Sequence, residues 1–304
     1  MAFGEHADVF DGKPVVDYEV GMTLEPDTTN YRLRLEYDSE ASFDELLTDF
    51  LSADNVDRVT GVLTGAYSEE MYEESMAPVV EAIIAAAPRL PSLSGLFIGD
   101  ITYEENEVSW IQQTDVGPVW TAFPKLRTFQ IRGGEGLGLG DIAHDQLKTL
   151  IVQTGGMPRE VLQALAAARL PELEHLELYL GDSNYGWTGT VSDIKALLQS
   201  DRFPKLKYLG LKNSEITDDI AELVSNAPIV TQLETLDLSL GTLGDAGAEK
   251  LLASENVKSL KKLDLSHHYM SDAMMERFSE LPCEVDVSEQ EHEEEWGRYV
   301  SIGE

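Results

Sequence analysis

Three copies of one leucine pattern lie 27 residues apart in the second half of the chain, and they constrain its fold more than any other feature. In each copy, leucines stand at the first, fourth and sixth positions, and an aspartate and a glutamate follow at matching offsets. The aligned positions are Leu206, Leu233 and Leu260; Leu209, Leu236 and Leu263; Leu211, Leu238 and Leu265; Asp218, Asp245 and Asp272; and Glu222, Glu249 and Glu276. Self-similarity at this period indicates one supersecondary unit stacked on copies of itself.

Each copy predicts a strand, a turn and a helix. Leu209 and Leu211 are two residues apart, so they project from the same side of a strand. Ile220 and Val224 recur at helical spacing, and Asp218 falls in the first helical turn, where the helix dipole favours a carboxylate. One unit cannot bury its apolar face alone. Stacked units are therefore expected to form an α/β, right-handed solenoid, or horseshoe, with a parallel sheet on the concave face and helices on the convex face.

Less regular copies extend the pattern toward the N-terminus. The first positions of all copies are residues 59, 93, 126, 147, 173, 206, 233 and 260, and a half copy follows at Val285. With a cap strand, this predicts nine or ten parallel strands. The longer spacings indicate insertions at about 100–119 and 181–190, and insertions in repeat proteins are often binding loops. The short unit at 126–146 predicts a glycine-rich turn and a short helix near 141–146.

Three regions are expected: an N-terminal cap at 1–55, one continuous solenoid at 56–288, and an acidic C-terminal tail at 289–304. Alternating patterns in the cap predict strands at 15–18 and 31–37. Ser42 and Glu45 form a capping box that predicts a helix to about residue 51. A second helix is predicted over 71–87. Such a cap shields the first open face of a solenoid.

The charge balance excludes some classes of partner. Fifty-six acidic residues stand against 22 basic ones, for a net charge of −34. This excess argues against binding nucleic acid or an anionic membrane, because both require basic residues. The sequence has no apolar run near the roughly 20 residues that span a bilayer. The first ten residues lack the features of a secretory signal, so we expect a cytoplasmic location. The acidity suits either solubility or recruitment of a basic partner.

Short motifs that resemble ligand sites are better explained as structure. The glycine run at 136–140 is not followed by the lysine of a phosphate-binding loop. The segment after Asp182 has Trp187 where a calcium loop requires glycine. His267 and His268 are neighbours on a strand and project to opposite faces. Cys283 is the only cysteine, which excludes a disulfide framework. We therefore expect no catalytic residues, no cofactor and no metal.

The units resemble the ribonuclease-inhibitor type of leucine-rich repeat over about residues 56–288. The sequence departs from that type after the strands, where Asn or Cys is common, so the curvature is expected to be uneven. The departing positions are Gly134, Gly155, Gly181, Ser214, Gly241 and His268. The ends, at 10–17 and 298–304, are also similar to an uncharacterised bacterial family of cytoplasmic leucine-rich-repeat proteins, and the similarity extends over the full length. Members of that family are encoded beside radical-enzyme and ATP-grasp homologues. This resemblance implies an accessory or scaffolding role.

The expected function is a non-catalytic scaffold that binds a protein or peptide, with a basic partner as one interpretation of the charge. The alternative is an accessory subunit that presents a peptide to a modifying enzyme system. The chain is expected to be a monomer. Outward strand positions and the 181–190 insertion supply the candidate binding residues, because aromatic residues are enriched at protein interfaces. These candidates are Tyr179, Tyr185, Trp187, Tyr208, His175, Glu177, Lys212, Asp237 and Asp264.

Two features of the concave face have alternative interpretations. The 181–190 loop is expected to lean over Tyr179 and Tyr208 as a wall of rings, or else to pack down and bury its own aromatic residues. The outward residues Leu63 and Phe97 are expected either to form an exposed apolar patch or to lie beneath the first insertion.

Overall fold

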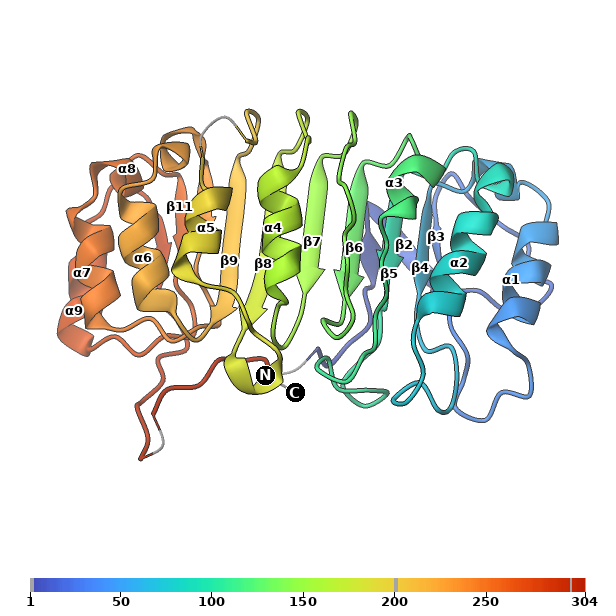
Figure 1. Cartoon of the computed structure of the whole chain (residues 1–304), viewed down its shortest axis with the longest axis horizontal. Helices are drawn as coiled ribbons and strands as arrows, with labels where there is room; N and C mark the ends of the chain where they lie inside the picture. The colour runs from blue at the N-terminus through green and yellow to red at the C-terminus, as the bar shows by residue number, and fades with distance from the viewer. Residues whose placement is uncertain (1–2, 200–201, 296, 304) are drawn as a thin grey trace.

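The chain folds into an open solenoid of stacked strand-and-helix units (Figure 1). The computed structural model describes residues 3–199, 202–295 and 297–303, so residues 296 and 304 of the expected tail lie outside the described residues. Within these ranges, twelve strands form one sheet in sequence order. Strands β2 to β12 pair in parallel, and β1 pairs antiparallel with β2. This architecture confirms the predicted α/β solenoid.

Helices cover one face of the sheet and lie in front of it in Figure 1. The strands are β1 (Val9–Phe10), β2 (Lys13–Asp17), β3 (Asn30–Leu33), β4 (Gly61–Thr64), β5 (Gly95–Ile98), β6 (Thr128–Arg132), β7 (Thr149–Gln153), β8 (His175–Gly181), β9 (Tyr208–Ser214), β10 (Thr235–Asp237), β11 (Lys262–Asp264) and β12 (Glu284–Asp286). The helices are α1 (Phe43–Ser52), α2 (Ala77–Ala85), α3 (Pro118–Ala122), α4 (Arg159–Ala167), α5 (Val191–Leu197), α6 (Thr217–Ser225), α7 (Asp245–Ala253), α8 (Glu255–Lys258) and α9 (Asp272–Phe278).

The repeated leucines form continuous rows through the core. Leu209, Leu236 and Leu263 are register partners on β9, β10 and β11, and all three are buried. The repeated aspartates do more than stabilise helix N-termini. The Oδ1 atom of Asp218 accepts hydrogen bonds from the backbone N–H groups of Gly244 (2.8 Å) and Gly247 (3.1 Å) in the next unit. Asp218 therefore connects two adjacent repeat units through hydrogen bonds.

Several expected element boundaries are wrong, for local reasons. Eleven described strands are parallel rather than nine or ten, because both cap strands join the sheet. β3 ends at Leu33 rather than residue 37. The helix expected over 71–87 begins only at Ala77, because the hydroxyl of Tyr67 donates to the carbonyl of Glu74 (2.5 Å) and holds the preceding residues in a loop. Residues 141–146 form no helix, since Ala143 there forms a β-bridge with Arg169.

Both ends of the chain pack against the solenoid. Residues 3–11, which we call the N-terminal strap, cross the concave side, and Figure 1 shows this blue segment behind the sheet. The C-terminal tail returns along the ends of the strands. Its Ser301 N–H donates to the carbonyl of Leu240 (2.9 Å), and its Ile302 N–H donates to Asn213 (2.8 Å). The two ends meet near β8 (Figure 1).

Replacing Leu236 with alanine is expected to lower the free energy of unfolding by about 3 kcal/mol, because the side chain is fully buried between two adjacent repeats. Denaturant titration measures this loss. Val20→Ala is the matched control, since Val20 is 66% exposed and its truncation should leave the transition unchanged. A loss for Leu236→Ala as small as that of the control would contradict the buried register.

Candidate functional site

The N-terminal half of the concave face is covered. Leu63 on β4 and Phe97 on β5 are outward strand positions, yet both are fully buried. Phe10 packs on them, with its ring centroid 6.1 Å from that of Phe97. The expectation that the first insertion covers these residues is therefore wrong, because the N-terminal strap covers them instead.

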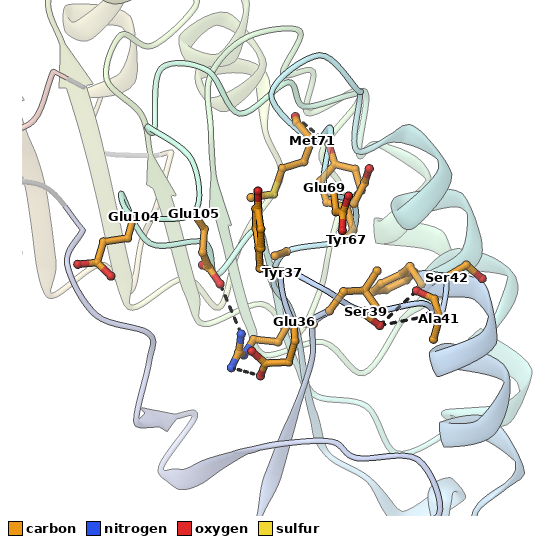
Figure 2. Close-up of a pocket in the computed structure, with 15 residues that line it drawn as sticks. Glu36, Tyr37, Ser39, Ala41, Ser42, Tyr67, Glu69, Met71, Glu104 and Glu105 are labelled. Atoms are coloured by element: carbon orange, nitrogen blue, oxygen red, sulfur yellow. Dashed lines mark hydrogen bonds and ion pairs between the residues drawn. The ribbon is translucent and has the colours of Figure 1, made fainter.

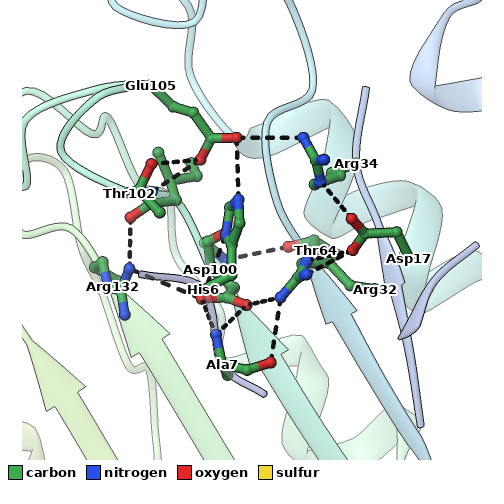
Figure 3. A network of polar contacts seen from close by, with 12 residues as sticks. His6, Ala7, Asp17, Arg32, Arg34, Thr64, Asp100, Thr102, Glu105 and Arg132 are labelled. Atoms are coloured by element: carbon green, nitrogen blue, oxygen red, sulfur yellow. Dashed lines mark hydrogen bonds and ion pairs between the residues drawn. The ribbon is translucent and has the colours of Figure 1, made fainter. Parts of the chain in front are cut away.

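A buried carboxylate anchors the strap (Figure 3). The Asp100 side chain is inaccessible to solvent and accepts a hydrogen bond from the Ala7 N–H (3.1 Å). Arg32 Nη1 lies 2.8 Å from Asp100 Oδ2, and Arg132 Nη1 lies 3.8 Å from Asp100 Oδ1. Burial lowers the pKa of Arg132 to about 10, so its guanidinium remains charged at neutral pH. Two guanidinium groups therefore surround the one buried carboxylate.

The two chain ends converge on Tyr179 of β8. The ring centroid of Phe3 lies 5.5 Å from that of Tyr179, and Ile302 packs in the same cluster. Tyr179 is consequently only 7% exposed. Burial, followed by the charge of Glu177, raises the pKa of Tyr179 to about 12. The tyrosine stays neutral and lies beneath both chain ends, so its ring offers little surface to a partner.

Beyond Tyr179, β8 to β10 present a connected polar cluster on the concave face. The imidazole of His175 stacks on the ring of Tyr208 at 3.9 Å between centroids. His175 Nε2 lies 3.0 Å from Glu177 Oε2. Lys212 Nζ bridges Glu177 Oε1 (3.3 Å) and Asp237 Oδ2 (3.2 Å), and the Tyr208 hydroxyl donates to Asp237 Oδ2 (2.6 Å). Every member has a partner, so the cluster is held in one arrangement.

Glycine at position 210 allows this convergence. A Cβ there would lie 3.1 Å from the ring of Tyr208, 3.2 Å from Glu177 and 3.4 Å from Lys212. The neighbouring side chains occupy the space that a larger residue would need. The sequence pattern alone did not indicate that this outward glycine makes room for its neighbours.

The charges of the cluster are mutually stabilised. Burial alone would raise the pKa of Glu177, but the hydrogen bond from His175 and the charge of Lys212 lower it below its usual value. Burial alone would lower the pKa of Lys212, but Glu177 and Asp237 raise it. Burial, then the nearby carboxylates, raises the pKa of Tyr208. Lys212 is therefore charged and Tyr208 neutral, so neither is poised as a proton acceptor at neutral pH.

Asp264 lies on the next strand, in register with Asp237 and with Asp286 of β12. Each of these aspartates accepts a hydrogen bond from the backbone N–H of the serine two residues later, at 2.9 to 3.2 Å. Lys262 Nζ is 3.0 Å from Asp264 Oδ2. A row of carboxylates therefore continues across the concave face beyond the polar cluster.

The 181–190 loop packs down rather than leaning over the face. Trp187 is only 6% exposed and belongs to the main core. Gly181 has a φ of +76°, and a Cβ there would collide with the backbone of Gly155, which the loop approaches closely. Tyr185 is half-buried and lines a separate hollow with Trp110 at the strand ends. The expected wall of rings over Tyr179 and Tyr208 is therefore wrong.

Seven of the nine expected residues thus lie on one concave surface, at outward positions of β8 to β11, whereas Tyr185 and Trp187 do not. The sequence pattern did not predict the N-terminal strap or its anchor at Asp100. The available signal was the pair Leu63 and Phe97, since apolar outward residues require a cover.

Across residues 3–199, 202–295 and 297–303, no group of three His, Cys, Asp or Glu side chains is arranged to hold a metal ion. Among the same residues, no helix is long and apolar enough to cross a membrane.

Comparisons with known proteins agree with this architecture. A crystal structure of a protein from Bacteroides fragilis, a structural-genomics target, matches with 31% sequence identity and a TM-score of 0.83. The match covers 90% of this chain and 77% of that one. An internalin from Listeria monocytogenes also matches, with 16% identity and a TM-score of 0.37, over 86% of this chain and 54% of that one.

A leucine-rich-repeat protein from Leptospira interrogans matches with 16% identity and a TM-score of 0.37, over 78% of this chain and 51% of that one. No curated protein matches the chain. The family model described as "Leucine Rich repeat" matches residues 231–252. With its repeats, its sheet and its likeness to the Bacteroides protein, the chain belongs to the leucine-rich-repeat family.

Proposed function

We propose that the uncovered part of the concave face, over β8 to β12, binds a protein or peptide with basic groups. Leucine-rich-repeat solenoids typically act as non-catalytic scaffolds that bind proteins on an extended concave surface. The observation that supports this site is that the N-terminal strap covers only one part of the concave face. The strap occupies the face over β4 and β5, where Leu63 and Phe97 lie beneath Phe10, while His175, Tyr208 and Lys262 remain partly accessible.

The charge of this surface favours a basic partner. Five carboxylates occupy its outward positions, and two lysines oppose them. These residues are Glu177, Asp237, Asp264, Glu284 and Asp286, and Lys212 and Lys262. The balance of two positive and five negative side chains leaves a formal local charge of about −3. Cationic side chains of a partner would be attracted and oriented by this field.

The aromatic pair adds an anchor. Tyr208 is stacked on His175 and bonded to Asp237, so it loses little conformational freedom when a partner packs on it. Tyrosine in such a rigid setting is typical of residues that dominate interface energies. The proposed surface therefore combines a preorganised ring with surrounding carboxylates.

The double variant Asp264→Asn with Asp286→Asn is expected to weaken partner binding by about tenfold. Asparagine keeps the oxygen that accepts from the serine N–H groups, so only charge is lost. Affinity capture from the native cell lysate identifies the partner, and titration then measures its affinity. Binding should also weaken as salt shortens the Debye length below about 8 Å.

Glu222→Gln with Glu249→Gln is the matched control. These residues lie on α6 and α7, on the convex side, and their replacement changes the net charge by the same amount. Equal weakening by both double variants would contradict a concave site. The captured partner also separates the two expected functions. A folded protein supports a scaffold, whereas a peptide together with a modifying enzyme supports an accessory subunit.

A further inference from the structure

We propose that a groove at the edge of the cap binds an extended, basic peptide segment of a partner protein. This edge groove opens where the chain leaves β3 and β4, and its volume is about 650 Å³. Figure 2 shows it between Glu104 and Glu105 on one side and Tyr67 and Met71 on the other. It is separate from the concave surface proposed above, and neither proposal depends on the other.

The floor of the edge groove is apolar. Tyr67 and Met71 are buried by the surrounding chain, and Ala66 and Phe43 beside them belong to the main core. Leu35 is partly buried against that core. An occupant that places an apolar side chain or the methylene stem of a long side chain here would remove apolar surface from water.

The rim carries four glutamates: Glu36, Glu69, Glu104 and Glu105. Among the described residues that line the groove, Arg34 is the single cation. Its guanidinium is already engaged by Asp17 (2.9 Å), Glu36 (2.6 Å) and Glu105 (3.6 Å). Four glutamates against one arginine give the rim a formal charge of about −3. An acidic occupant is therefore disfavoured and a basic one favoured.

Two rim side chains have no structural task of their own. Tyr37 is 89% exposed, although it stands at the centre of the groove in Figure 2. Within residues 3–199, 202–295 and 297–303, neither the Tyr37 hydroxyl nor the Glu69 carboxylate makes a hydrogen bond or ion pair with another described residue. A lysine or arginine placed between them would gain a carboxylate partner and the face of an aromatic ring.

The groove continues past Phe43 and Tyr67 into a second hollow of about 390 Å³. Asp44, Glu74 and apolar Val79 line this second hollow, and none of the described residues that line it is a lysine or arginine. The same chemistry, an apolar surface beside carboxylates, thus occurs twice in a row. A peptide with alternating basic and apolar side chains fits both hollows, whereas a single small amine could fill only one.

The test uses the full chain and three probes: a short peptide alternating lysine with leucine, the same peptide with glutamate in place of lysine, and spermine. Calorimetric titration measures each affinity. The lysine peptide is expected to bind most tightly. Tyr37→Ala, and separately Glu69→Gln with Glu104→Gln, should each weaken it at least about fivefold without shifting the melting temperature.

Matched controls locate the binding. Tyr299→Ala removes an exposed tyrosine at the other end of the chain, and Glu222→Gln with Glu249→Gln removes two convex charges. Both should bind the lysine peptide as the unmodified chain does. When Tyr37→Ala is added to the concave variant Asp264→Asn with Asp286→Asn, it should weaken binding of the lysine peptide by the same factor as in the unmodified chain, so failure of one proposal is distinguishable from failure of the other.

Each contrary outcome overturns the proposal. Binding that survives both Tyr37→Ala and the double glutamine variant would exclude the edge groove. Equal binding of the glutamate peptide would exclude charge recognition, and equal binding of spermine would replace the peptide with a small polycation. Loss of binding only in the concave variant would assign the peptide to the concave surface.

Discussion

Replacing Asp100 with alanine is expected to lower the free energy of unfolding by about 3–5 kcal/mol, because it leaves a buried cation without its counter-charge. Arg132 has Asp100 as its carboxylate partner at 3.8 Å and is almost fully buried. Arg32 also loses one of its two carboxylate partners, although Asp17 remains 2.6 Å away. The Ala7 N–H loses its acceptor, so the N-terminal strap should detach more readily.

Two measurements check this expectation. Denaturant titration gives the loss of stability, and amide hydrogen exchange at residues 3–11 reports opening of the strap. Asp145→Ala is the matched control, because Asp145 pairs with Arg169 at an exposed site and its loss should leave the transition in place. Asp100→Asn should be intermediate, since its oxygen still accepts from Ala7 but carries no charge. Native stability with protected strap amides in Asp100→Ala would contradict the anchoring role.

Replacing Trp187 with alanine is expected to cost about 3–5 kcal/mol, because a large buried ring is removed and a cavity remains. The ring lies in the main core and comes close to the backbone of Gly189. Thermal or denaturant unfolding measures the loss. Partner capture by the fraction that stays folded should be unchanged, because the ring does not reach the concave surface.

Trp110→Ala is the control for this prediction. Trp110 is the same residue type in the other insertion, but it is 55% exposed, and its removal should have little effect on stability. If Trp187→Ala kept native stability and lost partner capture instead, Trp187 would be a binding residue and its structural assignment would be wrong.

The rows of the core were predictable because they follow a local period. Leu209, Leu236 and Leu263 recur every 27 residues, and their burial follows from the alternation of a strand. The capping box of Ser42 and Glu45 was also predictable from local sequence, because all its atoms lie within one helical turn. Where a unit was too short or irregular, as at 141–146, the local pattern no longer identified the element.

The candidate surface was predicted in part. Outward positions placed His175, Tyr208 and Lys212 on one face, and the register of β8 and β9 brings them together. The sequence could not reveal which part of that face is open. Phe10 covers Phe97, which lies 87 positions later in the chain, and such long-range contacts leave no periodic signal.

The sequence by itself determined the solenoid, the strand register and the excess of negative charge, because each depends on residue type and spacing along the chain. Only the tertiary structure decided that the strap closes one half of the concave face and that Trp187 lies in the core. The edge groove also exists only in the tertiary structure, where residues near 34–43, 65–71 and 104–105 come together. These features depend on which distant segments compete for the same surface, and that competition is resolved by packing and desolvation in the folded chain.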